Sequence, residues 1–207
     1  MAGAGFLDEP ASSAAVEAMY AADLESDGYV MNLTRVWAHA PEVDAAWTAF
    51  TVASSTAAGL SFRMKGVIVS ALAAELGDAY CSYAWGSRLA SAAGAATAAA
   101  VLRDESGAAH DAAVDDGTTL EPTERIVAAW ARKVVRDPNS TTPNDIAVLR
   151  DAGFGDREIV ALTAYIAARI AFSTLNDALG AAPDPQLHAA APDAVRAAIT
   201  WGRQPAV

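Results

Sequence analysis

The sequence predicts an all-α protein. Alanine, the strongest helix former, makes up about a quarter of the 207 residues. Apolar residues recur at helical spacing between recognisable start and stop signals along almost the whole chain. No segment shows the alternation of apolar and polar residues that is typical of a strand. We expect a single domain over residues 1–207 with a core at about 32–187, because this length can bury one sizeable core.

The first half of the chain predicts six helices. Pro41 opens one of them, since proline at the first helical position gives up only an N–H that has no partner there. Ser61 is a favourable N-cap for the next helix, and Gly77 ends it. The expected ranges are Ser12–Leu24, Asn32–Ala38, Pro41–Ala57, Phe62–Leu76, Ala79–Ser91 and Ala95–Leu102.

Two of these helices differ in how their apolar residues are arranged. The helix at 62–76 is apolar almost all round in its middle, which indicates burial in the core. The helix at 41–57 instead carries one stripe of Val43, Trp47 and Phe50, which we expect to face the core.

The second half begins with an acidic, glycine-containing segment at about 103–120, expected to be a surface loop. Three helices should follow, the second of which begins with capping-box spacing. Their expected ranges are Glu121–Arg136, Thr142–Gly153 and Asp156–Leu179. The proline-flanked tail at 181–207 is expected to hold one short helix.

Composition excludes several classes of function. The chain has 14 basic and 25 acidic residues, a net charge of −11, and no basic cluster, so nucleic-acid binding is not expected. The apolar stretches at 66–74 and 92–102 are too short to cross a bilayer. No signal peptide is indicated, since the first basic residue is Arg35. We therefore expect a cytoplasmic protein that does not bind a membrane.

No metal centre or other cofactor is predicted. Cys81 is the only cysteine, which excludes a disulfide within one chain. The three histidines are not at metal-ligand spacing from one another. We expect His39 to donate a capping hydrogen bond, and His110 and His188 to be exposed.

The sharpest local feature surrounds Cys81. With Asp78 as N-cap, Cys81 lies in the first turn of its helix, where the helix dipole favours the reactive thiolate. The Asp78 carboxylate opposes that charge, and Arg88, two turns further on, would offset it. The alternative is that Cys81 is a small buried apolar residue, as free cysteines commonly are.

The last long helix carries a polar stripe beside its apolar one. The stripe has two interpretations: it lines a pocket that faces Cys81, or it is a hydrogen-bonded network or subunit contact. Its members are Tyr165, Arg169, Ser173 and Asn176.

The segment RMKGVIVSALAAELGDAYCSYAW resembles the core of the AhpD-like alkylhydroperoxidase family, which includes the carboxymuconolactone decarboxylases. That family carries Glu, eleven residues, then Cys-x-x-Cys-x-x-x-His. LEPTERIVAAWARKVVRDP, TTPNDIAVLRDAGFGDREIVAL and FSTLNDALG resemble, in order, later helices of its peroxidase-related members. The resemblance spans about 32–187. It implies an all-helical fold, homo-oligomers and a thiol peroxidase reaction.

In one register of the family motif, Cys81 takes the position of the second cysteine, which attacks peroxide. Asp78 then stands at the first cysteine, Trp85 at the histidine and Gly66 at the glutamate. The resemblance thus implies a catalytic role for Cys81. Asp78, one turn before it, is the second catalytic candidate, and Trp85 and Arg88 on the same helix are the candidates for substrate binding.

The other register makes Cys81 the first cysteine and loses the match of the preceding tyrosine. It puts Ala84 at the second cysteine, Arg88 at the histidine and Val69 at the glutamate. Both registers lack the glutamate–histidine relay and the second cysteine.

The leading hypothesis is a one-cysteine thiol peroxidase. Cys81 would attack a small hydroperoxide, and an external thiol would reduce the sulfenic acid that forms. Asp78 would act as the base or orient the thiol. Two alternatives stay open, a lyase that decarboxylates a small carboxylated lactone and a catalytically inactive homo-oligomer. In the latter, Asp78 is a plain N-cap, Trp85 a core residue and Arg88 a solvated charge.

Overall fold

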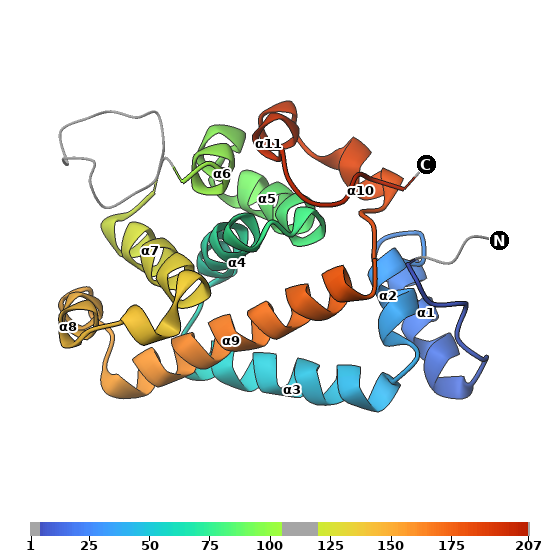
Figure 1. Ribbon diagram of the computed structural model, residues 1–207, viewed down its shortest axis with the longest axis horizontal. Coiled ribbons are helices and arrows are strands. Elements are labelled where there is room, and N and C mark those ends of the chain that lie inside the picture. The colour runs from blue at the N-terminus through green and yellow to red at the C-terminus, as the bar shows by residue number, and fades with distance from the viewer. Residues whose placement is uncertain (1–4, 105–119, 207) are drawn as a thin grey trace.

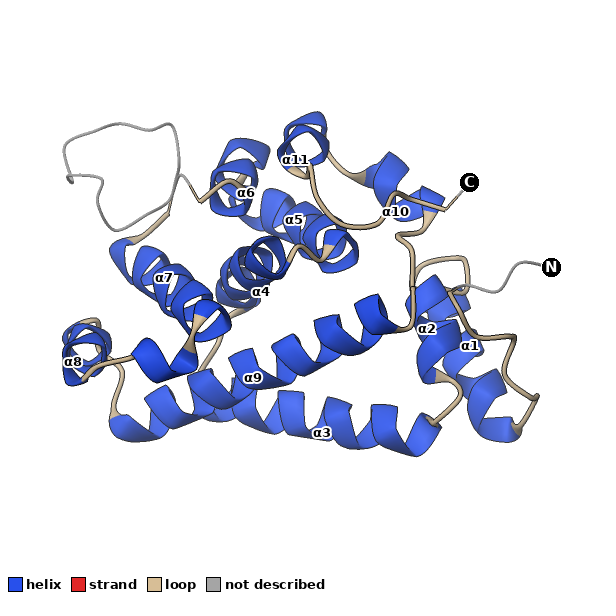
Figure 2. Cartoon of the chain, viewed as in Figure 1, coloured by secondary structure: helices blue, strands red, loops and turns tan. Residues whose placement is uncertain are grey.

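The computed structural model describes residues 5–104 and 120–206, in which every regular element is helical and no strand occurs (Figure 2). The all-α prediction is confirmed. The α-helices are α1 (Ala14–Ser26), α2 (Asn32–Trp37), α3 (Pro41–Ala57), α4 (Phe62–Leu76), α5 (Ala79–Ala93), α6 (Ala95–Leu102), α7 (Pro122–Arg136), α8 (Pro143–Asp151), α9 (Asp156–Ala178), α10 (Pro185–Ala190) and α11 (Asp193–Ala198). A 3₁₀ turn at Pro138–Ser140 joins α7 to α8.

Helix α4 lies at the centre of the arrangement and packs against α5, α6, α7 and α9 (Figure 1). The long helices α3 and α9 run side by side, and α10 and α11 cover α5 from the side away from α9. The start of α5 is therefore enclosed by protein on several sides.

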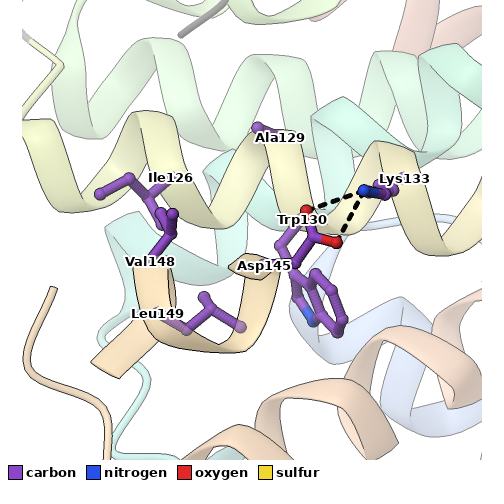
Figure 3. Close-up of a pocket in the computed structure, with 7 residues that line it drawn as sticks. All are labelled: Ile126, Ala129, Trp130, Lys133, Asp145, Val148 and Leu149. Carbon is purple, nitrogen blue, oxygen red and sulfur yellow. Dashed lines mark hydrogen bonds and ion pairs between the residues drawn. The ribbon is translucent and has the colours of Figure 1, made fainter. Parts of the chain in front are cut away.

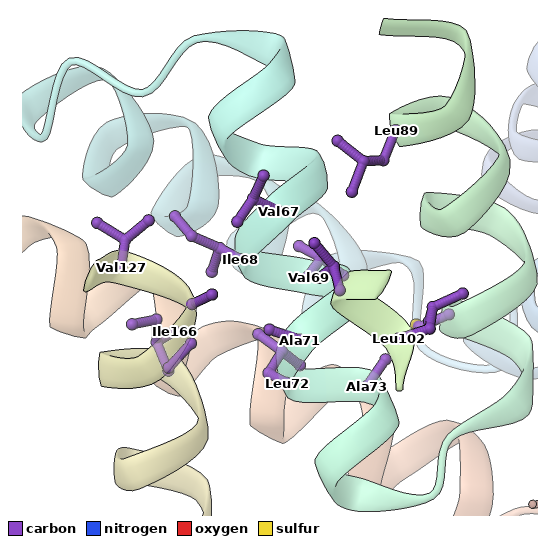
Figure 4. Close-up of a cluster of buried hydrophobic side chains, with 14 of the residues drawn as sticks. Val67, Ile68, Val69, Ala71, Leu72, Ala73, Leu89, Leu102, Val127 and Ile166 are labelled. Carbon is purple, nitrogen blue, oxygen red and sulfur yellow. The ribbon is translucent and has the colours of Figure 1, made fainter. Parts of the chain in front are cut away.

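The core is built on α4, as its apolar middle predicts. Val67, Ile68, Val69 and Leu72 are all fully buried and meet side chains from neighbouring helices (Figure 4). Burying a side chain of this size stabilises the fold by roughly 1.5–3 kcal/mol. The core also takes in Val195 from the tail, beyond the boundary expected near residue 187.

The predicted helix signals are present in the structure. Ser61 Oγ accepts the Met64 N–H at 3.1 Å, and Gly77 ends α4 in the left-handed region with φ 75°. Thr142 and Asp145 form the expected capping box at α8. Every predicted boundary of α2 to α9 lies within two residues of the observed one.

The tail and α3 correct the sequence analysis. The tail forms two short helices rather than one, because Pro185 and Pro192 each stand at the start of one. On α3, Trp47 packs inward, but Val43 and Phe50 are about half exposed. The stripe is narrower than predicted because α9 is the one long helix against α3.

Two smaller expectations also need comment. His188 is only half-exposed and meets the edge of the Tyr83 ring, with ring centroids 5.2 Å apart. Most of the acidic segment expected to be a loop, including His110, lies outside the described residues.

Helix α9 is 23 residues long and, among the described helices, the one that alone is long and apolar enough to cross a membrane. Half of its most apolar stretch is buried inside the protein, as in a core helix. The sequence analysis predicted this helix but did not count it among the long apolar stretches, because polar residues, Arg169 among them, interrupt its apolar run.

Candidate functional site

Cys81 lies on the wall of a cavity of about 320 Å³ between α5, α9 and the segment that joins α1 to α2. The cavity brings Cys81, Trp85 and Arg88 together, three of the four candidate site residues of the sequence analysis. The lining residues are Asp27, Tyr29, Met31, Leu33, Trp47, Tyr80, Cys81, Ala84, Trp85, Arg88, Arg169, Phe172 and Leu187.

Asp78, the fourth, lies behind Cys81 at the N-cap of α5. Its Oδ1 accepts the backbone N–H of Cys81 at 2.9 Å, so Cys81 stands in the first helical turn as predicted. Asp78 is fully buried, and its Oδ2 has no hydrogen-bond partner. This carboxylate therefore retains an acceptor close to the thiol.

Arg169 of α9 supplies the cation at the sulfur. Its Nη2 donates to Cys81 Sγ at 3.4 Å, and the residue is only 6% exposed. Its Nε has no hydrogen-bond partner, and no carboxylate in the described part of the chain forms an ion pair with it. A buried guanidinium without a counter-ion is costly, so its position needs another explanation than stability.

Aromatic rings partly compensate that charge. The Arg169 Cζ lies 4.7 Å from the Phe172 ring centroid, 5.4 Å from that of Trp47 and 5.5 Å from that of Trp85. Trp47 and Phe172 stack on each other with centroids 4.4 Å apart. The negative ring faces attract the cation and hold it beside the sulfur.

The electrostatics leave Cys81 a neutral thiol at rest. Burial raises the pKa of Cys81 far above its ordinary value, and the Asp78 carboxylate raises it further. Arg169 and Ser173 act in the opposite direction. A neutral thiol flanked by a proton acceptor and a cation has what it needs to ionise at the moment of attack.

At the rim of the cavity, Trp85 presents its ring to both arginines. The Arg88 Cζ lies 5.2 Å from the Trp85 centroid, and Arg88 is exposed. Arg88 lines the cavity, but the guanidinium at the sulfur comes from Arg169, which the sequence analysis gave only as a possible pocket lining. A basic residue within the apolar run of α9 was the available signal.

The polar stripe of α9 fits both of its interpretations in part. Arg169 lines the cavity, and Ser173 lowers the pKa of the Cys81 thiol. Asn176 Oδ1 instead accepts the Trp37 indole N–H at 2.8 Å. Tyr165 is buried near Arg169, and burial raises its pKa.

His39 lies away from the cavity. Its Nε2 is 2.9 Å from the Asp8 carbonyl oxygen, so it contacts the N-terminal segment instead.

Gly66, at the family's glutamate position in the preferred register, faces α5. A Cβ there would lie 3.2 Å from the Leu89 Cβ, closer than ordinary contacts. The two helices pack closely at this point, and a side chain at position 66 would require Leu89 to shift by a few tenths of an ångström.

A second cavity, of about 210 Å³, lies between α7 and α8 (Figure 3). It is lined mainly by apolar side chains, with the Lys133–Asp145 ion pair at one end. Its Lys133 and Asp145 are paired with each other, so the cavity at Cys81, where a thiol lies beside an arginine, is the stronger candidate site. Within residues 5–104 and 120–206, no cluster of three or more histidine, cysteine or acidic residues is arranged to hold a metal.

No protein-family model matches the chain, and no curated protein matches it in sequence. Solved structures do match. One is the alkylhydroperoxidase AhpD core of an uncharacterized peroxidase-related protein from Ralstonia eutropha JMP134, with TM-score 0.73, 19% identity and full coverage of both chains. Another is an uncharacterized peroxidase-related protein from Silicibacter sp. TM1040, with TM-score 0.72, 19% identity and coverage of 89% of this chain and 94% of that one. The chain has the AhpD-like helical fold.

Proposed function

We propose that this protein is a thiol-dependent peroxidase in which Cys81 is the nucleophile. The observation that carries the proposal is the pair of charges around the sulfur, with the Arg169 guanidinium hydrogen-bonded to Sγ and the buried Asp78 carboxylate behind it. The likeness to peroxidase-related proteins supports the same class of reaction.

In the first step, Cys81 Sγ attacks the terminal oxygen of a hydroperoxide, forming an S–O bond as the O–O bond breaks. Asp78 accepts the thiol proton, and the alkoxide that leaves takes up a proton to give the alcohol. Arg169 stabilises the negative charge that develops on sulfur and oxygen. Sulfur is oxidised to the sulfenic acid, and the peroxide is reduced.

The second step needs a thiol from outside, because the chain has no other cysteine. A thiolate attacks the sulfenic sulfur, releases water and forms a mixed disulfide. A further thiol then attacks that disulfide and returns Cys81 to its reduced state. The cavity at Cys81 offers the route for small thiols.

Stopped-flow measurement of hydroperoxide consumption with dithiothreitol tests this function. The wild-type protein should consume peroxide, whereas Cys81→Ser should show only the background rate of the free thiol. Trapping with dimedone should label Cys81 of the wild type after a pulse of peroxide. Equal rates for the two proteins would show that the sulfur is inert and the scaffold has no peroxidase activity.

We also propose that the protein works in the cytoplasm as a homo-oligomer. Free thiols persist in that compartment and supply the reductant. Several large apolar side chains are exposed, Phe50, Val52 and Phe62 among them, and a second copy would cover such side chains. Static light scattering should give at least twice the chain mass of 21.2 kDa, and a monomer mass would contradict this.

A further inference from the structure

The cavity at Cys81 holds two guanidinium groups and no paired carboxylate for either. Arg169 and Arg88 both have Cζ within 5.5 Å of the centroid of one ring, Trp85. In the described part of the chain, neither forms an ion pair with an acidic side chain. Two cations that share one aromatic ring and lack counter-ions make the cavity attractive to an anion.

Along α5, the lining residues form one continuous face. Cys81, Ala84, Trp85 and Arg88 stand at positions i, i+3, i+4 and i+7, so they follow one side of the helix from the sulfur to the rim. Seven residues of α-helix span about 10 Å. The small side chain of Ala84 leaves room between the Cys81 sulfur and Arg88.

From this arrangement we infer that the substrate is an organic hydroperoxide that carries a carboxylate, with its peroxide at Cys81 and Arg169 and its carboxylate at Arg88. This inference rests on the proposed peroxidase function and adds the class of substrate. The distance between the two ends suits an aryl or short-chain body about 10 Å long, and the aromatic walls suit a flat one.

The remaining charged and titratable groups at the rim permit this placement. Burial, followed by the Asp184, Asp27 and Asp23 charges, raises the pKa of Tyr29 to about 12, while Arg88 lowers it. Tyr29 is thus a neutral phenol that can donate to a carboxylate. Asp27 lines the same cavity but is exposed, so water screens its repulsion of an anion.

Arg88 is the carboxylate partner, because Arg169 is engaged with the sulfur and three rings at the enclosed end. The only contact found for Arg88 within the described residues is the Trp85 ring, so its N–H groups are available for a bidentate pair. The ring orients the guanidinium before the substrate arrives.

A binding measurement tests the anion site without peroxidase chemistry. The Cys81→Ser protein is titrated with 4-isopropylbenzoate and with the neutral 4-isopropylbenzamide, using the fluorescence of the tryptophans, of which Trp47 and Trp85 line the cavity. The acid should bind at least tenfold more tightly than the amide. Adding Arg88→Met should reduce this ratio to about one, whereas Arg157→Met, at an exposed arginine outside the cavity, should preserve it.

Kinetics then connect the anion site to turnover. For the wild type, kcat/KM for 4-carboxycumene hydroperoxide should exceed that for cumene hydroperoxide at least tenfold, and Arg88→Met should abolish the difference. Equal binding of acid and amide, or a preference that survives in Arg88→Met, would overturn the inference even if both hydroperoxides are consumed. A preserved preference for the acid without any hydroperoxide consumption would instead overturn the peroxidase function.

Discussion

Two buried arginines show how the same side chain serves two purposes in this molecule. Arg132 of α7 and Arg169 of α9 are 4% and 6% exposed. Arg132 Nε lies 2.9 Å from Asp104 Oδ1, its Nη1 lies 3.3 Å from Glu75 Oε2, and its Nη2 donates to the Val101 carbonyl. Arg169 contacts a thiol and three aromatic rings instead.

Under the proposed function, the difference separates an arginine that stabilises the fold from one that serves the reaction. The charge of Arg132 is balanced by acidic groups in the folded protein, so its burial is compensated. The charge of Arg169 is balanced only by ring faces and by the more distant Asp78, so the fold carries a cost at this point. Such a cost persists where the group serves a reaction or a ligand.

The largest expected effect follows from Arg169→Met. Methionine fills much of the same space but cannot stabilise the charge that develops on sulfur and peroxide. Removing one such donor lowers kcat by roughly 10²–10³-fold. Stopped-flow peroxide consumption measures this, with Arg157→Met as the matched control.

The stability of that variant sharpens the comparison. Because Arg169 is buried without an ion pair, Arg169→Met should unfold at the same urea concentration as the wild type or a higher one. A loss of stability as large as the loss of activity would show that Arg169 is a structural residue after all.

The reverse outcome is expected for Arg132→Met. This change removes the buried donor to the Val101 carbonyl and one cation of the cluster, although Glu75 and Asp104 both keep an ion pair with Arg136. Losing these buried contacts costs about 1–3 kcal/mol, which urea denaturation followed by circular dichroism measures. Peroxide consumption well below the unfolding midpoint should equal that of the wild type, and a selective loss of activity would contradict the division between the two arginines.

The sequence predicted the helices and the local geometry of the site because both depend on neighbours along the chain. Asp78 caps α5 and places Cys81 in the first turn through a contact three residues long. The sequence likewise placed Arg88 on the face of Cys81, since helical spacing determines that relation.

What escaped prediction depends on contacts between distant segments. Arg169 is 88 residues from Cys81, and the packing of both α5 and α9 against α4 brings the two together. Val43 and Phe50 are exposed because α3 has one long neighbour, a fact that its own periodicity does not contain. Burial of the thiol was one of two alternatives that the sequence left open, because the choice between them depends on residues of α9 that are distant along the chain.

The smallest expected effect concerns Asp177, one turn beyond Ser173 on α9. Burial raises the pKa of Asp177 to about 6, the Asp78 charge adds to the rise, and Arg203 opposes it. The folded protein therefore binds this proton more tightly than the unfolded chain, whose aspartates titrate near 3.9. Ionisation of Asp177 thus opposes folding, and its contribution to stability falls as the pH rises from about 4 to about 6.

Asp177→Asn removes that ionisation and should stabilise the protein at pH 7.5 by about 1 kcal/mol, a figure reduced for the partial exposure of the group. At pH 4 the wild type and the variant should unfold at nearly the same urea concentration. Because an ionised Asp78 contributes to the effect, the gain at pH 7.5 should shrink when Asp78→Asn is already present. A gain that does not depend on pH would show that ionisation of Asp177 does not oppose folding, and the stabilisation would then come from the changed side chain itself.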